Sequence, residues 1–222
     1  MSRNLILAAL AVVFAAIGGY VFLGGPGGSG AAVGPGLSAS AAESVDHSLV
    51  LEMALGDEDA AVTVIEYASF TCPHCRRFHE GPFKRLKADY IDTGKIHFIY
   101  REVYFDRYAL WAGLVARCGG ERRYFGLVDL IYRNQSVWMA SDDPVQIAES
   151  LRRLGRQAGL SDAALEACLQ DGDKAQAMVA LWQRHSERDD INSTPSFVIN
   201  GTKYSNMSYA DFSALLEEEL NG

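Results

Sequence analysis

The sequence predicts an α/β fold that is interrupted by a large all-helical insertion. Two β-rich runs, residues 62–68 and 96–103, flank a helical pattern, and together they make one βαβ unit with parallel strands. Over residues 106–188 only helical periodicity is found. A β-hairpin at residues 196–204 and a final helix follow. One domain of about 180 residues, large enough for a real hydrophobic core, accounts for all of these elements.

The first two strands are predicted from apolar, β-branched runs. Residues 49–55 indicate a short leading strand, and residues 62–68 indicate a buried central strand. Alternation along the central strand places Glu66 on the same face as Val62 and Val64. Glu66 is either a partly buried carboxyl or a solvated side chain at the end of a strand.

A helix is predicted from about residue 75 to about residue 92. Its apolar residues recur at helical spacing between Arg, Lys and Glu residues. We interpret Arg76, Arg77 and His79 as solvated residues of this helix, although Arg76 can add to the positive field around Cys72.

The later elements have clear start and turn signals. Asp143-Pro144 and Ser161 begin helices of the insertion. Asn200-Gly201 joins the two runs of the hairpin, because this dipeptide tolerates the positive φ angles of a type I′ turn. Ser208 caps a closing amphipathic helix that extends to about residue 220.

The first 23 residues (1–23) form a candidate membrane segment. Residues 5–23 are uncharged and apolar, and they reach roughly 29 Å as a helix, close to the thickness of a bilayer core. We expect an uncleaved signal anchor, with a cleaved signal peptide as the alternative, and Arg3 places the N-terminus in the cytoplasm. Residues 24–47 are rich in Gly, Ala and Ser and are predicted to form a flexible linker. Residues 48–222 are therefore expected on the outer side of the membrane.

Charge and cysteine content narrow the range of functions. All 28 acidic residues and 19 of the 20 basic residues follow residue 42, so this part carries a formal charge of about −9. Such a charge argues against nucleic acid or an anionic membrane surface as a partner. Four cysteines in an exported chain can form two disulfides, whereas the cytosol would keep them reduced.

The motif Cys72-Pro73-His74-Cys75 lies where the central strand ends and a helix begins. Free N–H groups and the positive end of the helix dipole stabilise a thiolate there, so Cys72 is predicted to be an exposed nucleophile with a lowered pKa. Pro73 fits the first helical turn, and His74 adds a donor near the sulfur. A zinc site needs a second ligand pair that the sequence does not offer, and an inert disulfide is the other alternative. The motif favours redox chemistry without a metal.

This order of elements resembles the thioredoxin-fold disulfide oxidoreductases of the DsbA type over roughly residues 48–222. Cys72-Pro73-His74-Cys75 matches the active-site motif of that family residue for residue. Glu66, six positions before Cys72, matches the acidic residue that the family places behind the site. Thr194-Pro195 matches its cis-proline loop. The resemblance implies a thioredoxin fold with an all-helical insertion.

The resemblance also implies roles for three of these residues. Glu66 is expected to exchange a proton with the buried Cys75. A cis Pro195 exposes the backbone of Thr194 beside Cys72, where a substrate peptide can add as a strand. The alternative is an ordinary trans proline that opens an edge strand.

Cys118 and Cys168 both fall in the insertion. Some members of the resembling family carry a second, non-catalytic disulfide there, so the resemblance implies that these two cysteines pair. Two buried free thiols are the alternative. We expect a structural role for the pair, because neither cysteine has a helix-start context or a neighbouring cysteine.

The function that the resemblance implies is a thiol oxidase for exported proteins. Its substrates are unfolded exported proteins with free thiols, and a quinone-linked membrane oxidase of the DsbB kind reoxidises the Cys72-Cys75 pair. This redox-active pair serves in place of an organic cofactor. The chain is expected to act as a monomer at the periplasmic face of a bacterial inner membrane, or in the soluble periplasm after cleavage.

Two other functions remain open. The same fold can act as a reductase or isomerase, and Thr194 before the proline also occurs in isomerase-like relatives. From a different class, a non-catalytic envelope protein could bind a soft metal through the two sulfurs. No methionine lies within ten residues of Cys72, which disfavours copper(I) delivery.

Overall fold

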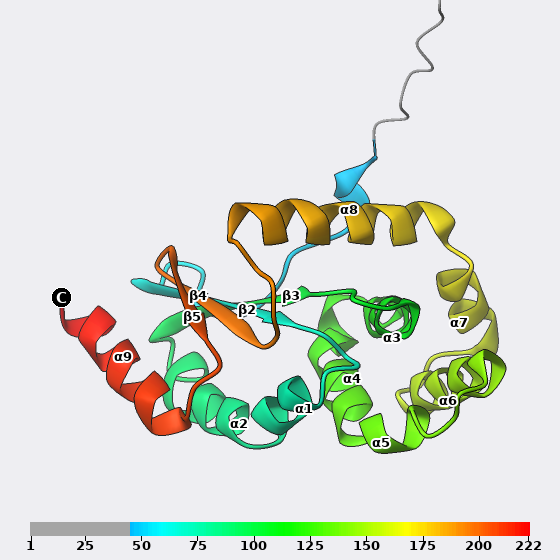
Figure 1. Cartoon of the computed structure of the whole chain (residues 1–222), viewed down its shortest axis with the longest axis horizontal. Helices are drawn as coiled ribbons and strands as arrows, with labels where there is room; N and C mark the ends of the chain where they lie inside the picture. The colour runs from blue at the N-terminus through cyan, green and yellow to red at the C-terminus, as the bar shows by residue number, and fades with distance from the viewer. Residues whose placement is uncertain (1–44) are drawn as a thin grey trace, which may run out of the picture. The chain divides into compact units, whose positions relative to one another are not determined.

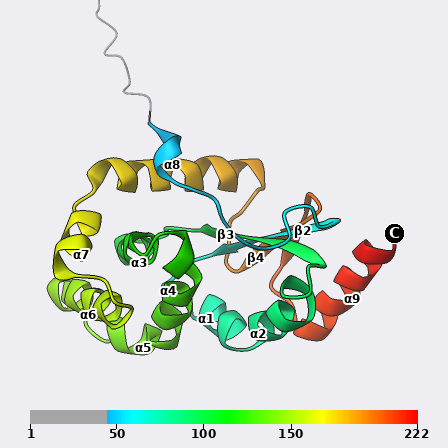
Figure 2. The same ribbon diagram turned by 180° about the vertical axis from the view of Figure 1, so that it is seen from behind.

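The computed structural model describes residues 45–222, and Figures 1 and 2 show this part from opposite sides. The predicted anchor or signal peptide, residues 1–23, and nearly all of the predicted linker, residues 24–47, lie outside the described residues. None of the helices within residues 45–222 is both long and apolar enough to cross a membrane.

A five-stranded mixed sheet forms the centre of the domain. Its strand order is β1-β3-β2-β4-β5. Strands β2 and β3 are parallel, with Val62 beside Ile96, and the other neighbouring strands are antiparallel. The strands are β1 (Met53–Gly56), β2 (Val62–Ala68), β3 (Ile96–Glu102), β4 (Ser196–Ile199) and β5 (Thr202–Ser205).

Helices cover both faces of the sheet. In Figures 1 and 2, α1, α2 and α9 lie on one face and α8 lies on the other, while α3 to α7 gather at one end. The helices are α1 (Pro73–Glu80), α2 (Pro82–Leu86), α3 (Arg107–Cys118), α4 (Glu121–Arg133), α5 (Gln135–Trp138), α6 (Pro144–Gln157), α7 (Asp162–Leu169), α8 (Gly172–Arg188) and α9 (Tyr209–Asn221). The predicted fold class, α/β with an all-helical insertion, is confirmed.

The helix predicted from residue 75 to residue 92 is broken. Helix α1 ends at Glu80, α2 begins at Pro82, and a π-helical turn at Lys87–Ile91 follows. Gly81 leaves helical geometry, with φ −124° and ψ −87°. Pro82 has no N–H group to continue the first helix, but it suits the first turn of a new one.

The leading strand is shorter than predicted. Asp46 accepts a hydrogen bond from the backbone of Ser48 and starts a 3₁₀ turn at His47–Leu49. Leu49, the first residue of the predicted strand, therefore lies in a turn instead of extending, and β1 begins only at Met53.

Gly56 ends β1 in the left-handed region, with φ +88°. A Cβ atom at this position would lie 2.3 Å from the carbonyl oxygen of Ile96. Gly56→Ala is therefore expected to lower the free energy of unfolding by about 2–4 kcal/mol, because backbone strain and atomic overlap act together. Urea unfolding measures this loss. Gly94→Ala is the matched control: it has φ +73° with nothing within 4 Å, so only about 1 kcal/mol is expected. Equal losses would show that the contact with Ile96 contributes nothing.

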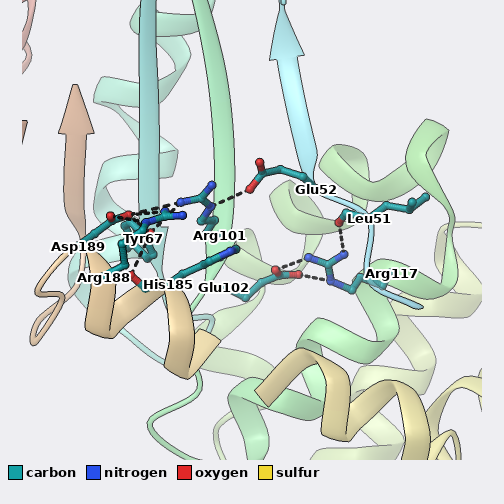
Figure 3. Close-up of polar contacts among 9 residues, drawn as sticks. All are labelled: Leu51, Glu52, Tyr67, Arg101, Glu102, Arg117, His185, Arg188 and Asp189. Atoms are coloured by element: carbon teal, nitrogen blue, oxygen red, sulfur yellow. Dashed lines mark hydrogen bonds and ion pairs between the residues drawn. The ribbon is translucent and has the colours of Figure 1, made fainter. Parts of the chain in front are cut away.

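A buried ion pair fastens the segment before β1 to the domain (Figure 3). Arg117 of α3 donates to both carboxylate oxygens of Glu102, at 2.8 and 2.5 Å, and to the carbonyl oxygen of Leu51 at 2.8 Å. The hydroxyl of Tyr124 donates to Glu102 at 2.7 Å. The side chains of Arg117 and Glu102 are only 5% and 3% exposed. Each nitrogen atom of the guanidinium and each oxygen atom of the carboxylate therefore has a hydrogen-bond partner within the protein.

A second polar cluster joins β3 to the end of α8, as Figure 3 also shows. Arg101 donates to Glu52 at 2.7 Å and to the hydroxyl of Tyr67 at 2.9 Å, and it pairs with Asp189 at 3.4 Å. A cavity of about 260 Å³ beside this cluster is lined in part by Tyr67, Arg101 and His185. Neither active-site cysteine lines this cavity.

Candidate active site

Cys72 and Cys75 lie where β2 leads into α1. Cys72 is the N-cap of α1, with extended backbone angles (φ −77°, ψ 120°), and Pro73 occupies the first helical turn. Both cysteines are free thiols; Cys72 is partly exposed and Cys75 is fully buried. The two sulfurs therefore differ in their access to a second molecule.

The pKa of Cys72 is lowered from 9.0 to about 5. The largest cause is a hydrogen bond from the thiol of Cys75. Further lowering comes from the side chain of Thr194 and from the backbone N–H groups of Cys75 and His74, whereas burial raises the pKa. The sulfur of Cys72 also lies 3.3 Å from the carbonyl oxygen of Thr194, a contact that favours the protonated thiol. The donors outweigh this contact, so Cys72 is a thiolate at neutral pH.

Burial raises the pKa of Cys75 well above its ordinary value. The negative charges of Cys72 and Glu66 act in the same direction. Cys75 therefore remains a thiol at neutral pH, and it can supply the hydrogen bond that stabilises the Cys72 thiolate.

The thiolate makes the stability of the reduced protein depend on pH. Because the folded-state pKa of Cys72 is depressed to about 5, its contribution is complete above the unfolded-state pKa near 9 and is lost as the pH falls through about 5. We expect the reduced form to gain stability relative to the disulfide form between about pH 5 and about pH 9. Urea unfolding of both forms measures the difference. A difference that stays constant over this range would contradict a thiolate at Cys72.

The donor that His74 supplies to Cys72 is its backbone N–H. The imidazole ring is exposed, and its Nδ1 lies 2.7 Å from Nη2 of Arg77, one helical turn later. The ring therefore interacts along the surface of α1, and the donor near the sulfur comes from the main chain of His74 and not, as predicted, from its side chain.

The peptide bond between Thr194 and Pro195 is cis, which excludes the trans alternative. It lies directly before β4, the strand that pairs antiparallel with β2. Although 122 residues separate Thr194 from Cys72, this loop brings its carbonyl oxygen to 3.3 Å from the sulfur. The backbone of Thr194 is thereby placed beside the partly exposed cysteine.

Glu66 is fully buried on β2, so it is not a solvated residue at the end of a strand. Its Oε2 lies 3.0 Å from Nε2 of His79, whereas its Oε1 has no hydrogen-bond partner among the described residues. The charge of Glu66 contributes to the raised pKa of Cys75. This carboxyl group therefore acts electrostatically on the inner sulfur.

The prediction that His79 is a solvated residue is wrong, because its side chain is only 4% exposed. His79 follows Cys75 by four residues, so both lie on the same face of α1. That face packs against the sheet and against α4. The spacing from Cys75 is the signal in the sequence that identifies His79 as part of the site.

Two residues of the insertion hold the active-site loop. Gln135 at the start of α5 donates from Nε2 to the carbonyl oxygens of Phe70, at 2.7 Å, and Cys72, at 3.0 Å. The hydroxyl of Tyr132 in α4 donates to the carbonyl oxygen of Ser69 at 3.2 Å. The sequence interpretation missed both residues, because no local pattern links Gln135 to a loop 63 residues away.

Cys118 of α3 and Cys168 of α7 form a disulfide within the insertion. The alternative of two free thiols is therefore excluded. Across the described part of the chain, no group of three or more His, Cys, Asp or Glu side chains could hold a metal ion.

Comparison with known sequences places the domain in a family. A family model described as thioredoxin matches residues 48–218. A Rickettsia bellii protein named as a protein-disulfide oxidoreductase is 33% identical over 170 residues, which cover 76% of this chain and 64% of that protein. The chain thus spans less than two-thirds of the length of this relative.

Two solved structures share the fold. The crystal structure of alpha-DsbA1 from Wolbachia pipientis has a TM-score of 0.72 and 26% identity, with 79% of this chain and 96% of that chain covered. The structure of oxidised BdbD from Bacillus subtilis has a TM-score of 0.67 and 21% identity, with coverage of 77% and 94%. Together with the family match over residues 48–218, the fold and the Cys-Pro-His-Cys site show that this chain belongs to the thioredoxin family, among its DsbA-like members with a helical insertion.

Proposed function

We propose that the chain is a thiol:disulfide oxidoreductase that introduces disulfide bonds into exported proteins. One observation carries the proposal: the partly exposed Cys72 has a pKa of about 5, whereas burial raises the pKa of Cys75. A couple whose outer sulfur is stabilised as a thiolate favours its reduced form. Electrons therefore pass from substrate thiols to the Cys72-Cys75 pair.

The reaction begins with Cys72 and Cys75 joined by a disulfide. A substrate thiolate attacks Cys72, because this sulfur is the accessible one; the bond to Cys75 breaks, and Cys75 takes up a proton. A second substrate thiolate then attacks the substrate sulfur of the mixed disulfide, and Cys72 leaves as a thiolate. The substrate departs with a new disulfide, and the pair has gained two electrons without an organic cofactor.

The loop at Thr194-Pro195 supports a way to hold the substrate. The Thr194 carbonyl lies 3.3 Å from the Cys72 sulfur, so an extended peptide that hydrogen-bonds to the Thr194 backbone would bring its cysteine to Cys72. Recognition through main-chain groups is independent of side chains, which suits unfolded proteins of varied sequence.

The reduced pair needs an electron acceptor to complete the cycle. We assign this role to a quinone-linked membrane oxidase of the DsbB kind. We place the domain in the periplasm as a monomer, either anchored to the inner membrane or released from it. The disulfide between Cys118 and Cys168 supports an oxidising compartment.

The deciding experiment is the reduction potential of Cys72-Cys75 in the full chain, equilibrated against glutathione, with Cys118 and Cys168 mapped by alkylation. We expect a potential well above the glutathione poise of about −240 mV. A value near or below that poise would make the chain a reductase or isomerase with the same fold. Metal analysis of the purified protein separates these enzymes from a soft-metal carrier, for which one bound metal per chain is expected.

A further inference from the structure

The cavity beside the Arg101 cluster lies between the segment at residues 47–52, strand β3 and helix α8. In Figures 1 and 2 this segment lies beside α8, on the face of the sheet opposite α1. The volume of the cavity is about 260 Å³. Tyr104 and Met178, which are buried, line it together with Leu51 and Arg184, which are exposed. The cavity therefore has a buried floor and a rim at the protein surface.

Part of the wall is apolar or aromatic. It is formed by Val50, Leu51, Tyr104, Met178, Leu181 and Trp182. The rings of Tyr104 and Trp182 meet edge to face, with centroids 6.0 Å apart, so this part of the wall is held in place by its own packing. An apolar cavity of roughly 150 Å³ holds one benzene molecule. The larger volume here therefore suits an apolar body of about ten non-hydrogen atoms.

The charged residues of the wall leave one positive charge without a partner. Arg101 pairs with Glu52 at 2.7 Å, and Arg117 pairs with Glu102 at 2.5 Å. Arg184 also lines the cavity, and within residues 45–222 no carboxylate forms an ion pair with it. The charged lining residues thus sum to +1 (3 − 2), whereas the chain after residue 42 carries about −9. A positive site in a strongly acidic protein favours an anionic ligand.

Two imidazole rings complete the polar part of the wall. The Nδ1 atom of His47 is buried and has no hydrogen-bond partner in the described part of the chain. The side chain of His185 lies between the two polar clusters of Figure 3. Its pKa is lowered from 6.5 to about 4, and burial is the largest cause. The charges that lower it further are those of Arg101, Arg188 and Arg184, and the charge of Glu52 acts in the opposite direction. His185 is therefore a neutral ring in a positive field.

We propose that this cavity binds a small amphipathic carboxylate, with its apolar body against Trp182 and its carboxylate group beside Arg184. A guanidinium presents two parallel N–H donors to a carboxylate, and a neutral imidazole can add a third donor. A cation would meet a net positive charge, and a neutral apolar molecule would gain nothing from the positive field. An inorganic anion would leave the apolar wall unfilled. The site is separate from the exchange at Cys72 and Cys75, because neither cysteine lines the cavity.

The test is a titration of the ¹⁵N-labelled full chain with 3-phenylpropionate, in a buffer free of other carboxylates. The indole N–H signal of Trp182, identified by its loss in Trp182→Phe, should shift and saturate with a dissociation constant between about 0.1 and about 1 mM. 3-Phenylpropanol has the same ring and chain without the charge, and it should bind about three- to tenfold more weakly. No saturable shift up to about 10 mM, or equal affinities for the acid and the alcohol, would overturn the inference.

Arg184→Gln tests the partner of the carboxylate group. Arg184 is exposed, so this substitution is expected to leave the fold intact. It should weaken binding of the acid about three- to tenfold and leave binding of the alcohol unchanged, so that the preference for the acid disappears. Arg153→Gln on α6 is the matched control, because Arg153 is also an exposed arginine but does not line the cavity, and both affinities should stay the same. Unaltered binding of the acid by Arg184→Gln would contradict the proposed site.

Discussion

Cys72→Ser is expected to abolish disulfide exchange, and Cys75→Ser is expected to arrest it at a mixed disulfide. A serine hydroxyl is not ionised in neutral water and cannot form a disulfide, so the exchange rate of Cys72→Ser should fall by more than about a thousandfold. In Cys75→Ser the outer sulfur is still present, and the serine hydroxyl can donate the hydrogen bond that the Cys75 thiol provides. The inner nucleophile is absent, so the adduct at Cys72 cannot be resolved from within.

The measurement uses the reduced variants, a peptide with one cysteine supplied as its symmetrical disulfide, and mass spectrometry of the protein at each time point. The Cys72 thiolate attacks the peptide disulfide, so one peptide becomes bound at Cys72 and the other leaves as a thiolate. Cys75→Ser should accumulate a peptide adduct at Cys72 in nearly stoichiometric amount, and Cys72→Ser should form none. The double variant Cys118→Ala/Cys168→Ala is the control: exchange should continue, although the free energy of unfolding should fall by up to about 4 kcal/mol. Reduction of the peptide disulfide by Cys72→Ser at the unaltered rate would refute the assignment of the nucleophile.

Arg117→Met is expected to destabilise the fold by about 3–5 kcal/mol, because it leaves the charge of Glu102 buried without its counterion. Glu102 is only 3% exposed, and Tyr124 alone would remain as its donor. The loss of the bond to the Leu51 carbonyl would also release the segment before β1. The midpoint of urea unfolding should therefore move strongly to lower concentration, with activity per folded molecule unchanged.

Two controls separate a buried charge from lost packing. Adding Glu102→Met to Arg117→Met should restore most of the stability, since a well-packed apolar pair of similar volume is close to neutral. Arg133→Met removes an exposed pair with Asp129, in which the side chains are 54% and 46% exposed, and should cost less than about 1 kcal/mol. Comparable losses in Arg117→Met and Arg133→Met would show that burial of the pair has no energetic consequence.

The parts of the fold that could be predicted from the sequence depend on short-range rules. The parallel pairing of β2 with β3 follows from a strand–helix–strand order of ordinary length. At the hairpin, Asn200 and Gly201 adopt φ angles of +44° and +86°. Asn-Gly is the dipeptide that tolerates such angles in succession. The helix-start position of Cys72 likewise depends on residues close to it in the chain.

The parts that could not be predicted depend on contacts between distant residues. The spacing from Cys75 puts His79 on the inner face of α1, but its polar partner Glu66 lies 13 residues earlier on another element, and no local pattern links the two. Gln135 had no signal at all, because its role is defined by backbone carbonyls in another element. The break at Gly81-Pro82 was hidden because Phe83 and Leu86 continue the apolar spacing beyond it.

The placement of the disulfide and of the proline loop late in the chain has a consequence for biosynthesis. A growing polypeptide presents the thiols of Cys72, Cys75 and Cys118 before Cys168 has been made. An oxidant that acts before Cys168 has been made finds three thiols, and Cys118 then has no correct partner. Thr194 is added later still, so an unfinished chain lacks the backbone that lies beside Cys72. On the proposed function, the protein is thus itself a client of the chemistry that it performs, and its Cys72 gains the Thr194 backbone as a neighbour only after residue 194 has been translated.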